Sequence, residues 1–173
     1  KKTIVIGICK LCLEEKELLK KSHILPEFLY RYSGVYDDKH RMHSFNGEDI
    51  LQNRKIRKEQ SGVYDCNILC ANCDNVIIGS YERYASMLIY GKDIPIESCP
   101  DCNTYRDTNS IFSICTNVDY TKYKLFLLSI LFRTSISNDD FFDKVKLSSE
   151  NEETIRKMVY EGNSGNYNDF PFL

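Results

Sequence analysis

The chain has 173 residues, of which 42% are hydrophobic, and its formal net charge is −2. The length fits one domain, or one small domain with a helical extension, and the apolar content is sufficient for a packed core. This charge argues against a globally basic nucleic-acid binder, and the longest mainly apolar stretch, Leu125 to Phe132, is far shorter than a membrane span.

The N-terminal half is predicted to combine short strands with two turns that each carry a pair of cysteines. Pro26 is expected either to end an extended piece or to open a short helix, because proline is tolerated at the first helical position. In chain order, the predicted elements are a strand over 3–8, a charged connector over 14–21, a helix over 27–32, a polar irregular stretch over 33–60 and a strand over 63–69.

The C-terminal half is predicted to be mainly helical. Gly91 is a natural helix end, and Ser149-x-x-Glu152 has the form of a capping box. The predicted elements are a helix from Asp74 to Gly91, a turn-rich connector over 92–117, a buried apolar helix over 119–135, a short amphipathic piece over 138–145 and a helix from 149 to about 161. The corresponding domain prediction is 1–91, a connector over 92–118, and a helical extension over 119–173 packed on the first unit.

Six of the eight cysteines form Cys-x-x-Cys pairs, namely Cys9/Cys12, Cys70/Cys73 and Cys99/Cys102. A two-residue spacer lets two thiolates approach one tetrahedral ion, and two such turns complete four-coordinate zinc. The N-terminal apolar run is too short for a signal peptide, so the pairs indicate metal or redox chemistry in a reducing compartment, the cytoplasm, and not a disulfide framework. We therefore predict one structural zinc ion held by the first two pairs.

The third pair, Cys99 and Cys102, has the turn composition of a further metal-binding knuckle. It could join Cys66 and Cys115 in a second zinc site, or compete for the first site. The alternative is a turn that carries two free thiols.

Three segments together resemble the cysteine-bearing HNH endonuclease pattern: Cys9-x-x-Cys12, His23-Ile-Leu-Pro26 and Ile68-Leu-Cys70-x-x-Cys73-Asp74-Asn75. The match covers about residues 9 to 80. The resemblance implies an α+β fold in which a treble-clef, ββα zinc unit precedes the helical extension. It also implies that His23 is the general base, that Asp74 binds a catalytic Mg²⁺ or Mn²⁺, and that the zinc is structural.

The chain departs from this pattern at two positions. Ser22 stands where the family has a metal-binding Asp or His, and a third ligand one turn after Asp74 would fall on an isoleucine. Glu82 lies two turns after Asp74 and could reach the site only with an unusual helix geometry. The alternatives are therefore a structural His23 beside the knuckle, and a non-catalytic treble-clef module that binds nucleic acid or a protein.

Basic residues gather between the first two cysteine pairs. They could follow a DNA backbone, although acidic residues in the same segment favour a solvated loop on charge alone. The candidate DNA-contacting residues are Arg31, Arg41, Arg54, Lys55, Arg57 and Lys58. The buried helix in the extension is expected to serve the core or a contact between identical chains.

Overall fold

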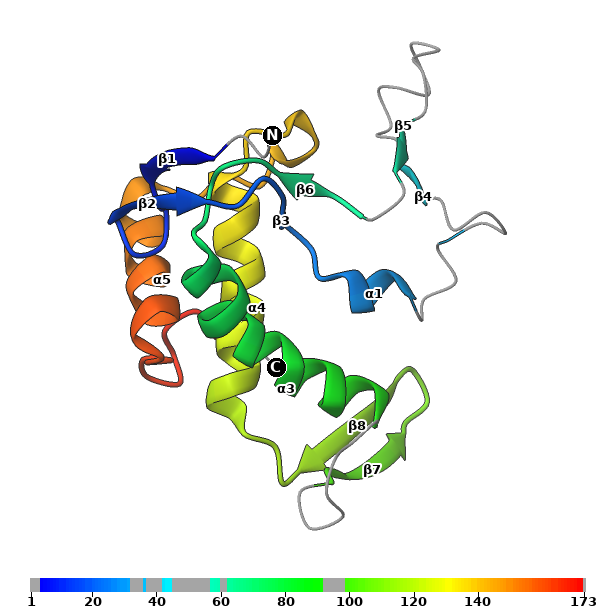
Figure 1. Cartoon of the computed structure of the whole chain (residues 1–173). Coiled ribbons are helices and arrows are strands. Elements are labelled where there is room, and N and C mark those ends of the chain that lie inside the picture. Colours follow the sequence, from blue (N-terminus) through cyan, green and yellow to red (C-terminus); the bar gives the residue numbers. More distant parts are fainter. Residues whose placement is uncertain are drawn as a thin grey trace.

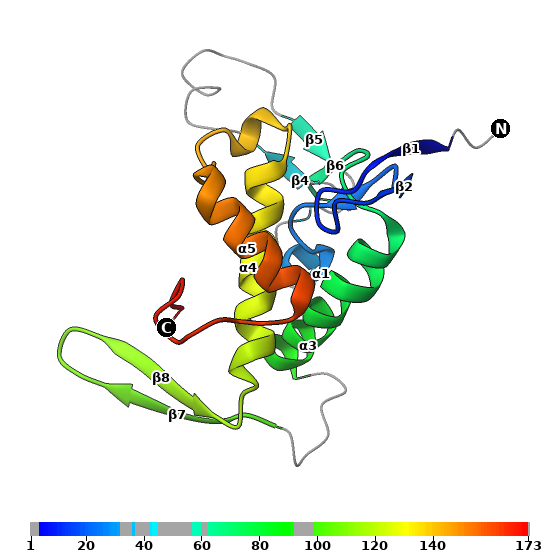
Figure 2. The same ribbon diagram turned by 90° about the vertical axis from the view of Figure 1, so that its left-hand side faces the viewer.

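The computed structural model describes residues 4–31, 36, 42–44, 57–59, 62–91 and 99–172. Within these ranges the chain is a mixture of helices and small antiparallel sheets, each of two strands. The predicted α+β class is confirmed at this level. Figures 1 and 2 show a long central helix with other helices beside it and the small sheets around its two ends.

Two strands frame the first cysteine turn. Strand β1 (Val5–Ile8) pairs antiparallel with β2 (Glu15–Leu18), so that Val5 faces Leu18 and Ile8 faces Glu15. The prediction of a charged connector over 14–21 was wrong at β2. Charged side chains are tolerated there because the two glutamates of the strand point to solvent while Leu18 is buried.

The next elements bring His23 to the second cysteine turn. Strand β3 (Ser22–His23) pairs antiparallel with β6 (Tyr64–Asp65), and α1 (Glu27–Arg31) follows Pro26 as predicted. Strand β6 is shorter than the predicted strand over 63–69, because the chain turns at Asn67, whose φ is 58°. Strands β4 (Met42–Ser44) and β5 (Arg57–Glu59) pair with each other.

The helix after the second cysteine turn begins with wide turns. Residues Asn72–Ile78 form a π-helix, η1, which continues directly into the α-helix α3 (Gly79–Tyr90). The predicted stop is confirmed, because Gly91 has a φ of 65° and its amide donates to the Met87 carbonyl. The π-helical geometry was not predicted.

A β-hairpin occupies part of the segment that was predicted to be a turn-rich connector. Strands β7 (Asp101–Arg106) and β8 (Ile111–Thr116) pair along their whole length, and every residue in them is exposed. Asp107 makes the turn, since its amide donates to the Ser110 carbonyl and its side chain accepts from the Thr108 amide. The hairpin projects from the lower end of the helices in Figure 2.

The central helix, α4 (Tyr120–Ile136), begins at Asp119, whose side chain accepts from the Lys122 amide. A short 3₁₀ turn, η3 (Asp140–Phe142), precedes α5 (Ser149–Glu161). The cap of α5 is Ser148 and not Ser149, so the predicted capping box is one residue out of register. The Glu152 carboxylate instead accepts from the Ser135 hydroxyl, which is a contact across to α4.

Helix α4 is the centre of the core. It packs against α3 and α5, and its buried face includes Phe126, Leu128 and Phe132. The same core contains Leu11 and Ile24 from the N-terminal segments. Of the helices in the described part of the chain, none combines the length and the apolarity needed to cross a membrane.

Candidate metal centre and buried polar cluster

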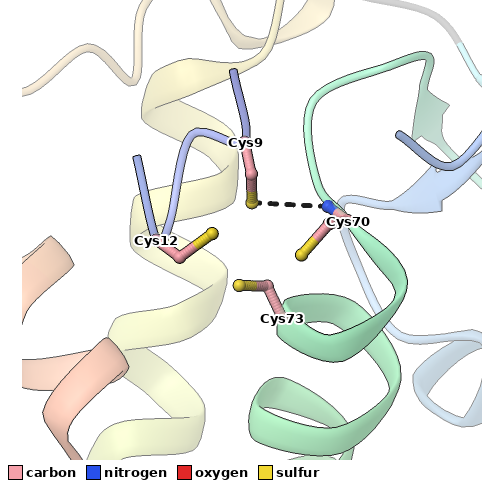
Figure 3. Close-up of side chains that lie close together, drawn as sticks. All are labelled: Cys9, Cys12, Cys70 and Cys73. Atoms are coloured by element: carbon pink, nitrogen blue, oxygen red, sulfur yellow. Dashed lines mark hydrogen bonds between the residues drawn. The ribbon is translucent and has the colours of Figure 1, made fainter. Parts of the chain in front are cut away.

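Four cysteines from two distant turns converge on one point. Cys9 and Cys12 lie in the turn between β1 and β2, while Cys70 precedes η1 and Cys73 lies in its first turn. Their sulfur atoms all lie within 4.8 Å of one another, and they point toward a common centre in Figure 3. Cys9, Cys70 and Cys73 are buried and Cys12 is partly buried.

Backbone hydrogen bonds hold the two turns against each other. The Lys10 amide donates to the Ile68 carbonyl at 2.9 Å, and the Cys70 amide donates to the Cys9 sulfur at 3.3 Å. The pKa of Cys9 is lowered to about 4, chiefly because the Cys73 thiol donates a hydrogen bond to it, and the pKa of Cys73 is raised by the same bond. A thiolate at Cys9 is therefore stabilised, as a metal ligand must be.

The cluster fits a closed structural metal site. Zinc binds thiolates at about 2.3 Å, which places tetrahedral sulfur atoms about 3.8 Å apart, within the spread observed here. All four positions would be filled by protein sulfur, so no position remains open for substrate. These four cysteines, predicted from spacing alone, form a group that can hold a metal ion such as zinc.

A second cluster lies beside the metal centre and is built around Arg133 of α4. The Arg133 side chain is 2% exposed, and its Nη1 donates to the backbone carbonyl of His23 at 2.7 Å. Its Nη2 lies 2.7 Å from Oε1 of Glu82, which is 25% exposed. Its Nε donates to the Ser129 carbonyl at 3.2 Å. One guanidinium therefore joins β3, α3 and α4.

Asp74 belongs to the same cluster. Burial raises the pKa of Asp74, and the charges of Arg133 and His23 oppose that effect, whereas the negative charge of Glu82 adds to it. Asp74 and Glu82 are drawn to one side of the helix by η1, because each π turn holds more residues than an α turn. Glu82 is near enough to Asp74 for its charge to affect the pKa of that carboxyl.

Searches against protein-family models, curated proteins and solved structures each return no match. The chemistry of the site therefore has to be read from its residues.

The predicted catalytic pair is close enough for His23 to act on the titration of Asp74. Arg133 also brings a positive charge to these residues, and it forms an ion pair with Glu82. In the part of the chain that the structure describes, the four cysteines are the only group of three or more potential metal ligands that lie close together. His23, Asp74 and Glu82 thus lie in a polar cluster in which the Arg133 guanidinium is a resident cation.

One cysteine of the third pair forms a disulfide bond, which differs from the predicted second metal site. Cys102 is bonded to Cys115 across the β7–β8 hairpin, where the two residues are direct cross-strand partners. Cys66 and Cys99 are exposed and free. Cys102 therefore does not share a metal with Cys99 while this bond is present, because its sulfur is committed to Cys115.

The candidate DNA-contacting residues fall mostly outside what the structure describes. Arg41, Arg54 and Lys55 lie outside the described residues. Arg31 ends α1, and Arg57 and Lys58 lie in β5, which fixes their backbone position only.

Sequence reasoning missed Arg133. A signal was present, because Lys124 and Arg133 directly flank the apolar run Leu125 to Phe132 of a helix that is predicted to be buried, and a charge in such a helix requires a buried partner. Lys124 has one as well, since its Nζ donates to the Asn166 carbonyl at 2.9 Å.

Proposed function

We propose that this chain is an HNH-type endonuclease that hydrolyses DNA phosphodiester bonds, built on a treble-clef unit with a structural zinc ion at the four cysteines. The observation that carries the proposal is that His23, from β3, is near enough to Asp74, from η1, for its charge to oppose the rise in the pKa of Asp74, and that Asp74 directly follows the cluster cysteine Cys73. A histidine and a carboxylate next to a zinc knuckle match the roles that the HNH resemblance assigns to these two residues.

The roles of the two side chains follow from their chemistry. A neutral imidazole at His23 takes a proton from the attacking water, since histidine changes charge near pH 7. The Asp74 carboxylate would hold the divalent ion, because hard cations such as Mg²⁺ and Mn²⁺ prefer oxygen ligands. The bound ion would supply charge stabilisation on the phosphate and the leaving oxygen. The cysteine site has no open position and contributes only structure.

The test is cleavage of supercoiled plasmid with Mg²⁺ or Mn²⁺ by wild type, His23→Ala and Asp74→Asn. Asp140→Asn, at an exposed carboxylate in η3, is the matched control. We expect cleavage by wild type and the control, and a loss of about 10²-fold or more in the two site variants. Equal inactivity of wild type and His23→Ala over a range of divalent ions would refute the proposal.

One observation favours a second candidate, which is a zinc module that binds nucleic acid or a protein without catalysis. Arg133 already neutralises Glu82 within the cluster, as an ion would. This candidate predicts DNA binding that weakens steeply with salt, with no turnover under any divalent ion. Binding and cleavage measured on the same preparation separate the two candidates.

A further inference from the structure

The guanidinium of Arg133 is buried, and the burial of a charge carries a free-energy cost. An isolated charge inside a protein is strongly unfavourable unless it is paired and hydrogen-bonded. Arg133 meets this requirement with three different elements, through the His23 carbonyl, the Glu82 carboxylate and the Ser129 carbonyl. Arg133 thus contacts both β3 and the Glu82 side chain, the first by a hydrogen bond and the second by an ion pair.

The contact to His23 is made through the backbone and not through the imidazole. The acceptor is the carbonyl oxygen of His23, at 2.7 Å from Nη1. Since β3 has only two residues, its position depends strongly on each bond that it makes. The amide of the next residue, Ile24, donates to the Val63 carbonyl at 2.9 Å, so the strand is held from both directions.

The partner strand is fixed from the same end of α4. Oδ2 of Asp65, in β6, accepts from the Asn138 amide at 2.7 Å and from the Ser137 hydroxyl at 3.2 Å. Both strands of this sheet are therefore anchored to the C-terminal end of α4. Arg133 of α4 binds β3, and Asp65 of β6 binds the residues that follow α4.

We infer that Arg133 is a positioning residue, which fixes the His23 backbone relative to Asp74 and Glu82 and so makes helix α4 part of the candidate active site. The inference deepens the proposed endonuclease function and rests on it for its catalytic consequence. A fork-shaped guanidinium is needed because it donates in two directions at once, which a lysine ammonium at the end of a flexible stem does not reproduce.

The test compares Arg133→Met and Arg133→Lys with Lys124→Met. Lys124 is a fitting control, because it is also a buried cation of α4 that donates to a backbone carbonyl. It lies nine residues before Arg133, which is about 13 Å along the helix axis, and it holds the chain near Asn166. Zinc content and helix content confirm that each variant is folded, and Arg133→Lys decides the question if Arg133→Met does not fold.

Two readouts are taken, one kinetic and one independent of activity. In the plasmid assay we expect kcat to fall between ten- and a hundredfold in both Arg133 variants, with KM within about twofold, because a displaced base impairs the chemical step more than substrate binding. In nuclear magnetic resonance spectra we expect the imidazole carbon and proton signals of His23 to shift in both Arg133 variants. Lys124→Met should match wild type in both readouts.

The outcomes separate the positioning role from the proposed function. If wild type does not cleave DNA, the endonuclease proposal fails, and the His23 signals alone decide the role of Arg133. Wild-type His23 signals in folded Arg133→Lys would overturn the inference. An equal loss of kcat in Lys124→Met would also overturn it, since the effect would then be general to the helix.

Discussion

The guanidinium of Arg133 donates to the backbone carbonyl of His23 at 2.7 Å and so joins two residues that are 110 positions apart in the chain. The same guanidinium forms an ion pair with Glu82. The C-terminal helices are therefore bound to the N-terminal segment by a buried polar contact in addition to the apolar core.

Replacing Glu82 by Gln should destabilise the protein, because it removes the carboxylate that pairs with the buried guanidinium of Arg133. Removing one partner of a fully buried pair costs about 3–5 kcal/mol, and the partial exposure of Glu82 lowers our expectation to about 2–3 kcal/mol. Denaturant unfolding measures this free energy. The control is Glu153→Gln, whose carboxylate is 46% exposed in its pair with Arg156, so that a smaller loss is expected. Equal losses in the two variants would show that the Arg133 pair is not effectively buried.

Removal of the bound metal should unfold the N-terminal segment. The four cysteine sulfurs lie within 4.8 Å of one another, and the cysteines pack in the core with Leu11 and Leu69. Release of the ion would remove the bonds that join the two cysteine turns in this part of the core. In small zinc domains, metal binding supplies about 10–16 kcal/mol of apparent folding free energy. We expect a chelator to lower the melting temperature by at least about 15 °C, with recovery when Zn²⁺ is added back. An unchanged melting curve after metal removal would argue against a structural ion.

The chain should bind one zinc ion and not two. Because Cys102 is bonded to Cys115, the doubly substituted Cys102→Ser, Cys115→Ser protein should retain the zinc content of wild type. Cys73→Ser, which removes a buried ligand of the predicted site, should lose most of its zinc. Atomic emission spectroscopy on purified protein gives the stoichiometry. Two ions in wild type and one in the double variant would instead support a metal role for the third cysteine pair.

Arg156 of α5 repeats the arrangement of Arg133 at the first cysteine turn. Its Nη1 donates to the Leu11 carbonyl at 2.6 Å, and its Nε lies 2.6 Å from the Glu153 carboxylate. Arg156→Met should cost about 1–2 kcal/mol, as expected for the loss of a hydrogen bond from a charged group. Lys157→Met, at the neighbouring exposed cation, should cost less than about 0.5 kcal/mol. Chemical denaturation of both variants tests the difference, and similar values would show that the contact to Leu11 adds little.

The cysteine cluster was predictable because its signal is local in sequence. Two Cys-x-x-Cys pairs fix the residue type and the spacing, and tetrahedral coordination then requires the two turns to meet. The helix end at Gly91 was predictable for a similar reason, since a left-handed residue with no Cβ penalty is a local requirement.

The polar cluster was only partly predictable. His23 and Asp74 were found through a pattern, but Arg133 acts through a backbone carbonyl, which imposes no residue type on its partner. The hairpin of β7 and β8 was missed because all its residues are exposed, so no alternation of apolar and polar side chains was needed to form it. Strand β2 was not predicted because glutamate and lysine are uncommon in strands. Its conformation is decided instead by its pairing with β1.

The π-helical turns of η1 determine the direction in which the side chains of α3 project from the helix. If the seven residues Asn72–Ile78 took ordinary α-helical turns without a change in length, the helix after them would be rotated relative to the cysteines, because an α turn holds fewer residues than a π turn. Glu82 would then swing away from Arg133 while the cysteines upstream stayed in place. The direction of the Glu82 side chain relative to the four cysteines is thus set by the π-helical geometry of η1, so a change that restored α-helical turns there would alter the polar cluster without replacing any of its side chains.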